Sequence, residues 1–71
     1  MNVEDGDELP IRVTFECLSG DYWNCQLAVM PHVGDTVVIA SAPKGTEHVV
    51  HRIIHHVGGA NHRIVIKVSR I

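Results

Sequence analysis

The stretch IRVTFECLSGDYWNCQLAV, residues 11–29, decides the fold class. Apolar and polar residues alternate along residues 11–17 and again along residues 22–29, which is the period of a strand with one buried and one solvated face. The Ser19-Gly20-Asp21 segment between the two runs is rich in turn-forming residues. The stretch therefore predicts a β-hairpin.

The rest of the chain supplies three further apolar segments. Residues 36–40 form a short continuous apolar run, which predicts a strand covered on both faces. Residues 47–57 fit either an amphipathic helix or a strand, and residues 58–61 suit either a helix cap or a hairpin turn. The apolar residues of 47–57 are all β-branched, so we favour a strand there. Alternation along residues 63–69 predicts a last strand.

Composition supports the same fold class. The chain has 71 residues, of which 21 are Val, Ile or Thr, and β-branched residues favour sheet over helix. We expect a flexible acidic arm at residues 1–9 and one small domain at residues 10–71, because a second core does not fit this length. Five strands in about 60 residues predict an all-β, antiparallel, partly closed barrel. The alternative is an α+β fold with a helix at residues 47–57.

Three segments carry a resemblance to a known family. They are Pro31-His32-Val33-Gly34-Asp35-Thr36-Val37-Val38-Ile39, then Val49-Val50-His51-Arg52-Ile53, then Ile64-Val65-Ile66-Lys67-Val68. The pattern resembles small SH3-like barrels, in which a V-G-D-x-V turn opens one central strand, and similar patterns occur in small uncharacterised bacterial and phage proteins. The resemblance implies a five-stranded SH3-like barrel. Only three aromatic residues are present, so we do not expect the proline-rich ligands of the peptide-binding members.

Charge is unevenly distributed along the chain. The net charge is -2, but four acidic residues lie within the first ten positions, and residues 11–71 carry a formal +2. This balance argues against a strongly basic nucleic-acid binder. A weaker nucleic-acid surface remains an alternative, with an exposed Tyr22 as a stacking platform and basic residues of the last two strands as phosphate contacts; those residues are Arg52, Arg63, Lys67 and Arg70. The competing interpretation is a solvated face that keeps strand edges from aggregating.

Histidine and cysteine together suggest a zinc site. His51 and His55 have the H-x3-H spacing of paired zinc ligands, and Cys17 and Cys25 supply two thiols. On a strand the two histidines share a face but lie too far apart to chelate one ion. We therefore favour reduced core thiols and surface imidazoles, and we expect no cofactor. The surface imidazoles expected are His48, His51, His55, His56 and His62.

Function is predicted by elimination. No phosphate-binding loop, nucleophile elbow or paired-carboxylate motif is present, so we expect no enzymatic activity. No apolar run approaches the ~18 residues that span a bilayer, and the acidic start lacks the features of a secretory leader, so we expect a cytoplasmic protein. The sequence predicts a binding or assembly module that contacts a protein partner or a second copy through its edge strands.

Overall fold

The computed structural model describes residues 9–71, and within that range the chain consists of strands, turns and loops without a helix. The predicted all-β class with five strands is confirmed. The predicted acidic arm lies, except for Leu9, outside the described residues. The strands are β1 (Ile11–Cys17), β2 (Tyr22–Leu27), β3 (Thr36–Val37), β4 (His48–Gly58) and β5 (Asn61–Arg70).

All five strands belong to one sheet, in the order β2-β1-β5-β4-β3. The β1–β2 and β4–β5 pairs are antiparallel hairpins, as predicted. The two hairpins meet through β1 and β5, which run parallel, with Phe15 opposite Ile66. The prediction of a purely antiparallel barrel is therefore wrong at this one pair. Apolar alternation specifies which face of a strand is buried, but not the direction of its neighbour.

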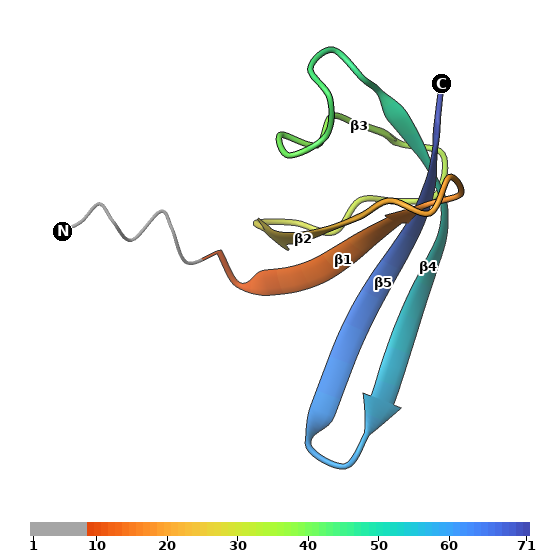
Figure 1. Cartoon of the computed structure of the whole chain (residues 1–71). Coiled ribbons are helices and arrows are strands. Elements are labelled where there is room, and N and C mark those ends of the chain that lie inside the picture. Colours follow the sequence, from red (N-terminus) through yellow and green to blue (C-terminus); the bar gives the residue numbers. More distant parts are fainter. Residues whose placement is uncertain (1–8) are drawn as a thin grey trace, which may run out of the picture.

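The sheet curls into a half-barrel, and the β4–β5 hairpin extends well beyond β1 (Figure 1). The edge strands β2 and β3 are not paired with each other, so the barrel stays open. The face inside the curl is called the inner face here, and the opposite one the outer face. Because side chains alternate along a strand, residues two apart share a face unless a bulge intervenes.

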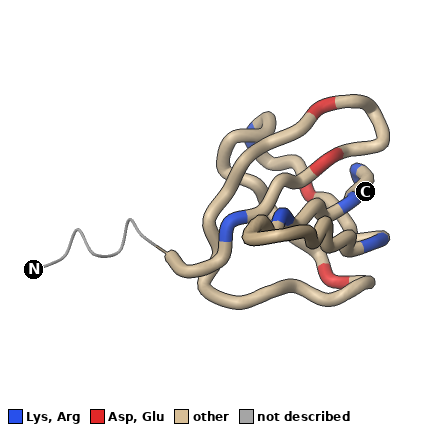
Figure 2. The backbone as a smooth tube through the Cα atoms, turned by 90° about the horizontal axis from the view of Figure 1, so that it is seen from below, with Lys and Arg blue, Asp and Glu red and all other residues tan. Residues whose placement is uncertain are grey.

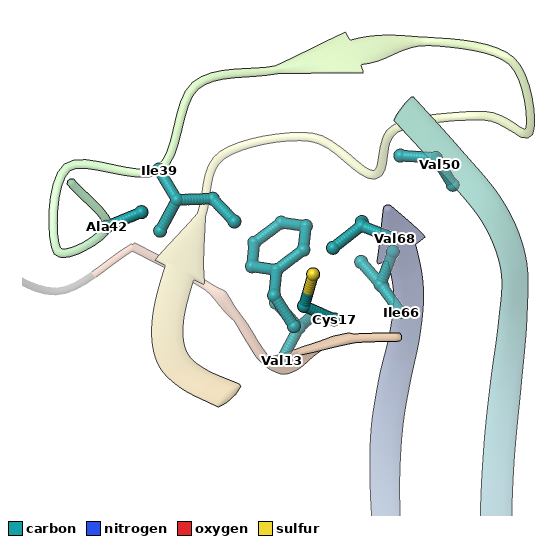
Figure 3. Close-up of a cluster of buried hydrophobic side chains, with 8 residues drawn as sticks. Val13, Cys17, Ile39, Ala42, Val50, Ile66 and Val68 are labelled. Carbon is teal, nitrogen blue, oxygen red and sulfur yellow. The ribbon is translucent and has the colours of Figure 1, made fainter. Parts of the chain in front are cut away.

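The core lies on the inner face. Val13 and Phe15 from β1 pack there against Ile66 and Val68 from β5, and all four are at most 4% exposed. Ile39 and Ala42, from the segment after β3, approach the same cluster from the other side, as Figure 3 shows. Trp23 is half-buried against the cluster, whereas Tyr22 is 65% exposed, and both placements confirm the alternation of β2.

The predicted strand at residues 36–40 is mostly absent. Only Thr36 and Val37 pair with β4, and the expected cover on both faces is wrong, because Val38 is 67% exposed while Ile39 is buried. The backbone leaves the sheet after Val37, and Ile39 reaches the core from the loop that follows.

The ambiguous segment is a strand, and the helical alternative is wrong. Its β-branched residues suit the pleated surface of β4, where Ile53 lies opposite Ile66 and Ile54 opposite Val65. The register shifts between Val50 and Arg52, which marks a β-bulge at His51. After the bulge, odd-numbered residues of β4 share the inner face with Ile64 and Ile66, and even-numbered residues share the outer face with Val65.

Candidate functional site

The predicted basic surface is only partly assembled. Strand register puts Arg52 opposite Lys67 on the outer face, and Arg63 lies two positions from Val65 on the same face. Tyr22 joins them from β2, since it pairs with Glu16, which in turn pairs with Lys67. Figure 2 shows the Lys and Arg positions spread over several parts of the chain. The outer face is therefore mildly basic and carries one exposed aromatic ring.

Arg70 does not belong to this set. It lies opposite His48 at the start of β4, and the two residues line the same small hollow with Trp23 and Cys17. Alternation along β5 explains why Arg70 differs from Arg63 and Lys67, because position 70 has the opposite parity and shares a face with Ile66 and Val68. The bulge in β4 explains the difference from Arg52, because positions before the bulge have the opposite parity from positions after it. The sequence pattern of β5 could therefore separate Arg70 from Arg63 and Lys67, but it could not place Arg52.

Lys67 is already partnered. Its Nζ donates a hydrogen bond to Glu16 Oε1 at 2.5 Å, and both side chains are about two-fifths exposed. The hydrogen bond from Lys67 lowers the pKa of Glu16 below the ordinary glutamate value of 4.5, and the positive charges of Lys67 and Arg63 act in the same direction. This pair neutralises part of the basic surface and ties β1 to β5.

A Glu16→Gln substitution is expected to lower Tm slightly at neutral pH. The folded-state pKa of Glu16 is lowered, so its stabilising contribution is present above the ordinary pKa and is lost as pH falls through the lowered value. The Tm difference between the wild type and E16Q should therefore shrink to zero in acid. Thermal melts from about pH 7 to about pH 3 measure this.

Glu47→Gln is the matched control for that experiment. Glu47 is exposed and forms no ion pair among residues 9–71. A Tm difference for E16Q that persists unchanged at the acid end, or that E47Q reproduces, contradicts the assigned role of the Glu16–Lys67 pair.

The four residues predicted as zinc ligands are not brought together. Cys25 pairs with Val13, four positions along β1 from Cys17, and both thiols are free. His51 lies at the bulge, where its Nε2 is 2.5 Å from Ser69 Oγ on the outer-face side. His55 lies on the inner face, so the expectation that the two histidines share a face is wrong. No three potential ligands converge within the described part of the chain.

The two thiols have different environments, and both are packed against the core as predicted. Hydrogen bonds from the side chain and backbone of Ser19 lower the pKa of Cys17. Burial raises the pKa of Cys25. Among residues 9–71, neither thiol lies in an ion-pair network, and neither belongs to a group of three or more side chains that could bind a metal ion. This fits the interpretation that both cysteines are core residues.

His48 is buried, so its predicted place among the surface imidazoles is wrong. Its side chain is 1% exposed, and its ring meets Trp23 edge-on at a centroid distance of 5.4 Å. A cavity of about 110 Å³ is lined by both residues and by Cys17 and Thr46. His48 lies on the inner face because it precedes the bulge, and it is thereby removed from any surface site.

A close pair of imidazoles lies near the end of the β4–β5 hairpin. His55 Nδ1 and His62 Nε2 are 2.9 Å apart, and the ring centroids are 5.1 Å apart. Both residues are on the inner face, since His55 pairs with Ile64 and His62 pairs with Val57. The sequence patterns did not indicate this pair. In a hairpin that turns after Gly58, positions 55 and 62 fall on the same face two positions out of register, but using this signal required the strand assignment and the turn.

The free edge of β4 is one of two long unpaired strand edges among the described residues, the other being the free edge of β2. β3 pairs only with His48 and Val49, and the Gly34–Asp35 turn hydrogen-bonds to Val50. Beyond the bulge, residues 52–58 have no neighbouring strand on that side within residues 9–71. Val57 in this stretch is 74% exposed. The arrangement offers backbone donors and acceptors to an additional strand.

No helix in the described residues is long and apolar enough to cross a membrane. No family model matches the chain, and neither a curated protein nor a solved structure matches it.

Proposed function

We propose that this protein is a non-enzymatic assembly module that pairs with a second copy of itself through the free edge of β4. The observation that carries the proposal is the absence of a neighbouring strand along residues 52–58, within the part of the chain the structure describes. Unpaired strand edges recruit other strands, and addition of a strand to a sheet edge is a common mode of protein association.

The edge carries little of the usual protection against pairing. Proteins block exposed edges with lysines, prolines, inward-pointing charges or β-bulges, and here the bulge at His51 lies before the free stretch rather than within it. Residues 52–58 read RIIHHVG, and Arg52 is the one Lys or Arg among them. The short β3 covers the other end of β4, so the free stretch begins beside the part of β5 that pairs with β1 and continues into the part of the hairpin that extends beyond β1 (Figure 1).

The sequence of this edge is complementary to itself. In a two-fold antiparallel pairing centred on His55, each Ile53 lies opposite Val57 of the other copy, and each Arg52 lies opposite Gly58. Apolar residues then meet on the inner face, and the two arginines are kept apart. In this arrangement the same surface patch of both copies meets across a two-fold axis. Two-fold symmetry is the commonest symmetry of soluble homo-oligomers.

Sedimentation equilibrium over a range of chain concentrations tests this proposal. A strand edge of seven residues is smaller than a standard interface of about 1,600 Å² in total, so we expect a reversible dimer of micromolar affinity. A monomer that persists into the high micromolar range contradicts the proposal.

A second candidate function is nucleic-acid binding, and the outer face favours it because Arg52, Arg63 and Tyr22 share that face. Fluorescence anisotropy with short single- and double-stranded oligonucleotides should then show affinity that falls steeply with salt. Arg63→Gln should lower the salt slope by about one, whereas the loop substitution Lys44→Gln should leave it unchanged. No binding at low salt excludes this candidate.

Three finer predictions accompany the proposed function. We infer that the half-barrel is a variant of the SH3-like barrel, supported by the V-G-D-x-V segment at residues 33–37, which turns into β3. The expected cytoplasmic location and the bacterial or phage origin stay predictions.

A further inference from the structure

The two hairpins separate from each other beyond one end of the β1–β5 pairing. The pairing runs parallel from the Val13–Ile64 pair onward, and in the other direction the two strands diverge, as Figure 1 shows. Arg12 and Arg63 each stand one position before that pair, on the outer face of β1 and β5 respectively. An open hollow of about 780 Å³ is lined there by residues of β1, β2 and β5, both arginines among them. A hollow of this size is large enough for a small ligand.

Positive charge dominates this hollow. Neither arginine forms an ion pair within residues 9–71, and no Asp or Glu is among the described residues that line the hollow. Glu16 lies on the same face, but its carboxylate already accepts a hydrogen bond from Lys67. Like charges on neighbouring strands destabilise a sheet. The two guanidinium groups therefore favour the binding of an anion between them.

Two amide side chains from β2 add hydrogen-bond donors to the same hollow. Asn24 Oδ1 accepts a hydrogen bond from Thr14 Oγ1 at 2.8 Å, and Gln26 Oε1 accepts one from the backbone N–H of Leu9 at 3.2 Å. Each amide carbonyl is thus engaged, and the NH₂ group of each amide has no protein partner among residues 9–71. Asn24 and Gln26 both line the hollow, so the four side chains offer a ligand mainly donors.

We propose that Arg12 and Arg63 bind a phosphate group in this hollow, with the NH₂ groups of Asn24 and Gln26 as further donors. Phosphate oxygens are strong acceptors, and the planar guanidinium group of arginine donates two parallel hydrogen bonds to them. The site lies within one copy of the chain, so it does not depend on the pairing of β4 edges. The phosphate belongs either to a small compound or to the backbone of a nucleic acid, and the experiment below distinguishes the two.

The parallel β1–β5 pair is what assembles the site. Arg12 was not among the basic residues that the sequence predicted for a binding surface, because it lies near the start of the chain, far in sequence from the basic residues of the last two strands. Arg52, which was predicted, lies opposite Lys67 and does not line the hollow. Arg52 is therefore a matched control for the two arginines of the site.

The test is an NMR titration of the full ¹⁵N-labelled chain with inorganic phosphate near neutral pH. Sodium chloride is adjusted to keep the ionic strength constant, which removes general screening effects from the comparison. We expect saturable shifts of the backbone amides of Arg12, Asn24 and Arg63, with a Kd in the millimolar range. Arg12→Gln and Arg63→Gln should each raise this Kd about tenfold, because each removes a pair of charge-assisted hydrogen bonds.

Two further variants separate the proposed contacts from net charge. Asn24→Asp keeps the size of the side chain and an oxygen for Thr14, but it replaces the NH₂ donors with a negative charge, so it should abolish phosphate binding. Arg52→Gln removes one positive charge from the same face outside the hollow, and it should change the Kd by less than about twofold. All four substituted residues are exposed, and the amide spectrum of each variant shows that it is folded.

Three outcomes overturn the site: no saturable shift with phosphate, shifts confined to other parts of the chain, or a loss in R52Q equal to that in R63Q. The last would mean that phosphate responds to net charge alone. A single-stranded oligonucleotide is then added to the phosphate-bound wild type. If it displaces phosphate from the same amides, the site holds a nucleic-acid backbone, and if phosphate stays bound, the site holds a small phosphate compound; both results support a phosphate site.

Discussion

A Val57→Lys variant is expected to sediment as a monomer at concentrations where the wild type is a dimer. Val57 is 74% exposed, so the substitution leaves the core untouched. In the proposed dimer, however, each introduced lysine lies opposite Ile53 of the other copy, and the change occurs twice per dimer. Losing two apolar cross-strand pairs at about 0.2–1 kcal/mol each raises the dimer Kd by roughly twofold to thirtyfold.

Val29→Lys is the matched control. Val29 is 75% exposed and follows β2, on the opposite side of the sheet order from β4. The same change of charge and size there should leave the dimer Kd and the Tm near their wild-type values. If V57K associates as tightly as the wild type, or if V29K dissociates the dimer instead, then the contact does not involve the β4 edge.

Phe15→Ala is expected to have the largest effect on stability. Phe15 is 3% exposed in the centre of the core cluster, and truncating a buried Phe costs about 3–5 kcal/mol. A domain of this length has a total unfolding free energy of about 4–10 kcal/mol. The variant should therefore lose most of its stability, with a Tm lower by more than about 10 °C.

Tyr22→Ala provides the comparison for that experiment. Tyr22 lies on the neighbouring strand and has a ring of similar size, but it is 65% exposed on the outer face. Removing it should change the unfolding free energy by less than about 0.5 kcal/mol. Urea denaturation followed by circular dichroism measures both variants. Equal destabilisation by the two would mean that the inner face is not the buried one.

Sequence patterns predicted the local parts of this fold. The alternation in β1 and β2 identified the residues that face the core, and the β-branched residues of β4 favoured a strand over a helix. In β5 the alternation identified Ile66 and Val68 but placed Val65 on the solvated face, whereas Val65 is 4% exposed. The parallel β1–β5 pair was not predictable in this way, because β-alternation is the same for either direction. The apolar run at residues 36–40 predicted a strand that is covered on both faces. The chain instead leaves the sheet after Val37, and only Ile39 among residues 38–40 is buried.

The candidate sites depended on pairing that no local pattern encodes. His51 and His55 share the spacing of zinc ligands, but the bulge places them on opposite faces. The bulge likewise separates Arg70 from Arg52 on the two faces of the hairpin. His62 gained its significance only from the register of the β4–β5 hairpin, which sets it beside His55.

The parallel pair of β1 and β5 has a consequence for how the chain folds during synthesis. The β1–β2 hairpin leaves the ribosome early, yet the strand that covers the other side of β1 is the last of the five to be made. Phe15 pairs with a residue that is made much later, Ile66, and contacts between residues so distant in sequence form slowly. The nascent hairpin consequently exposes its apolar face until β5 emerges, and in that interval the chain is most vulnerable to aggregation and to proteases.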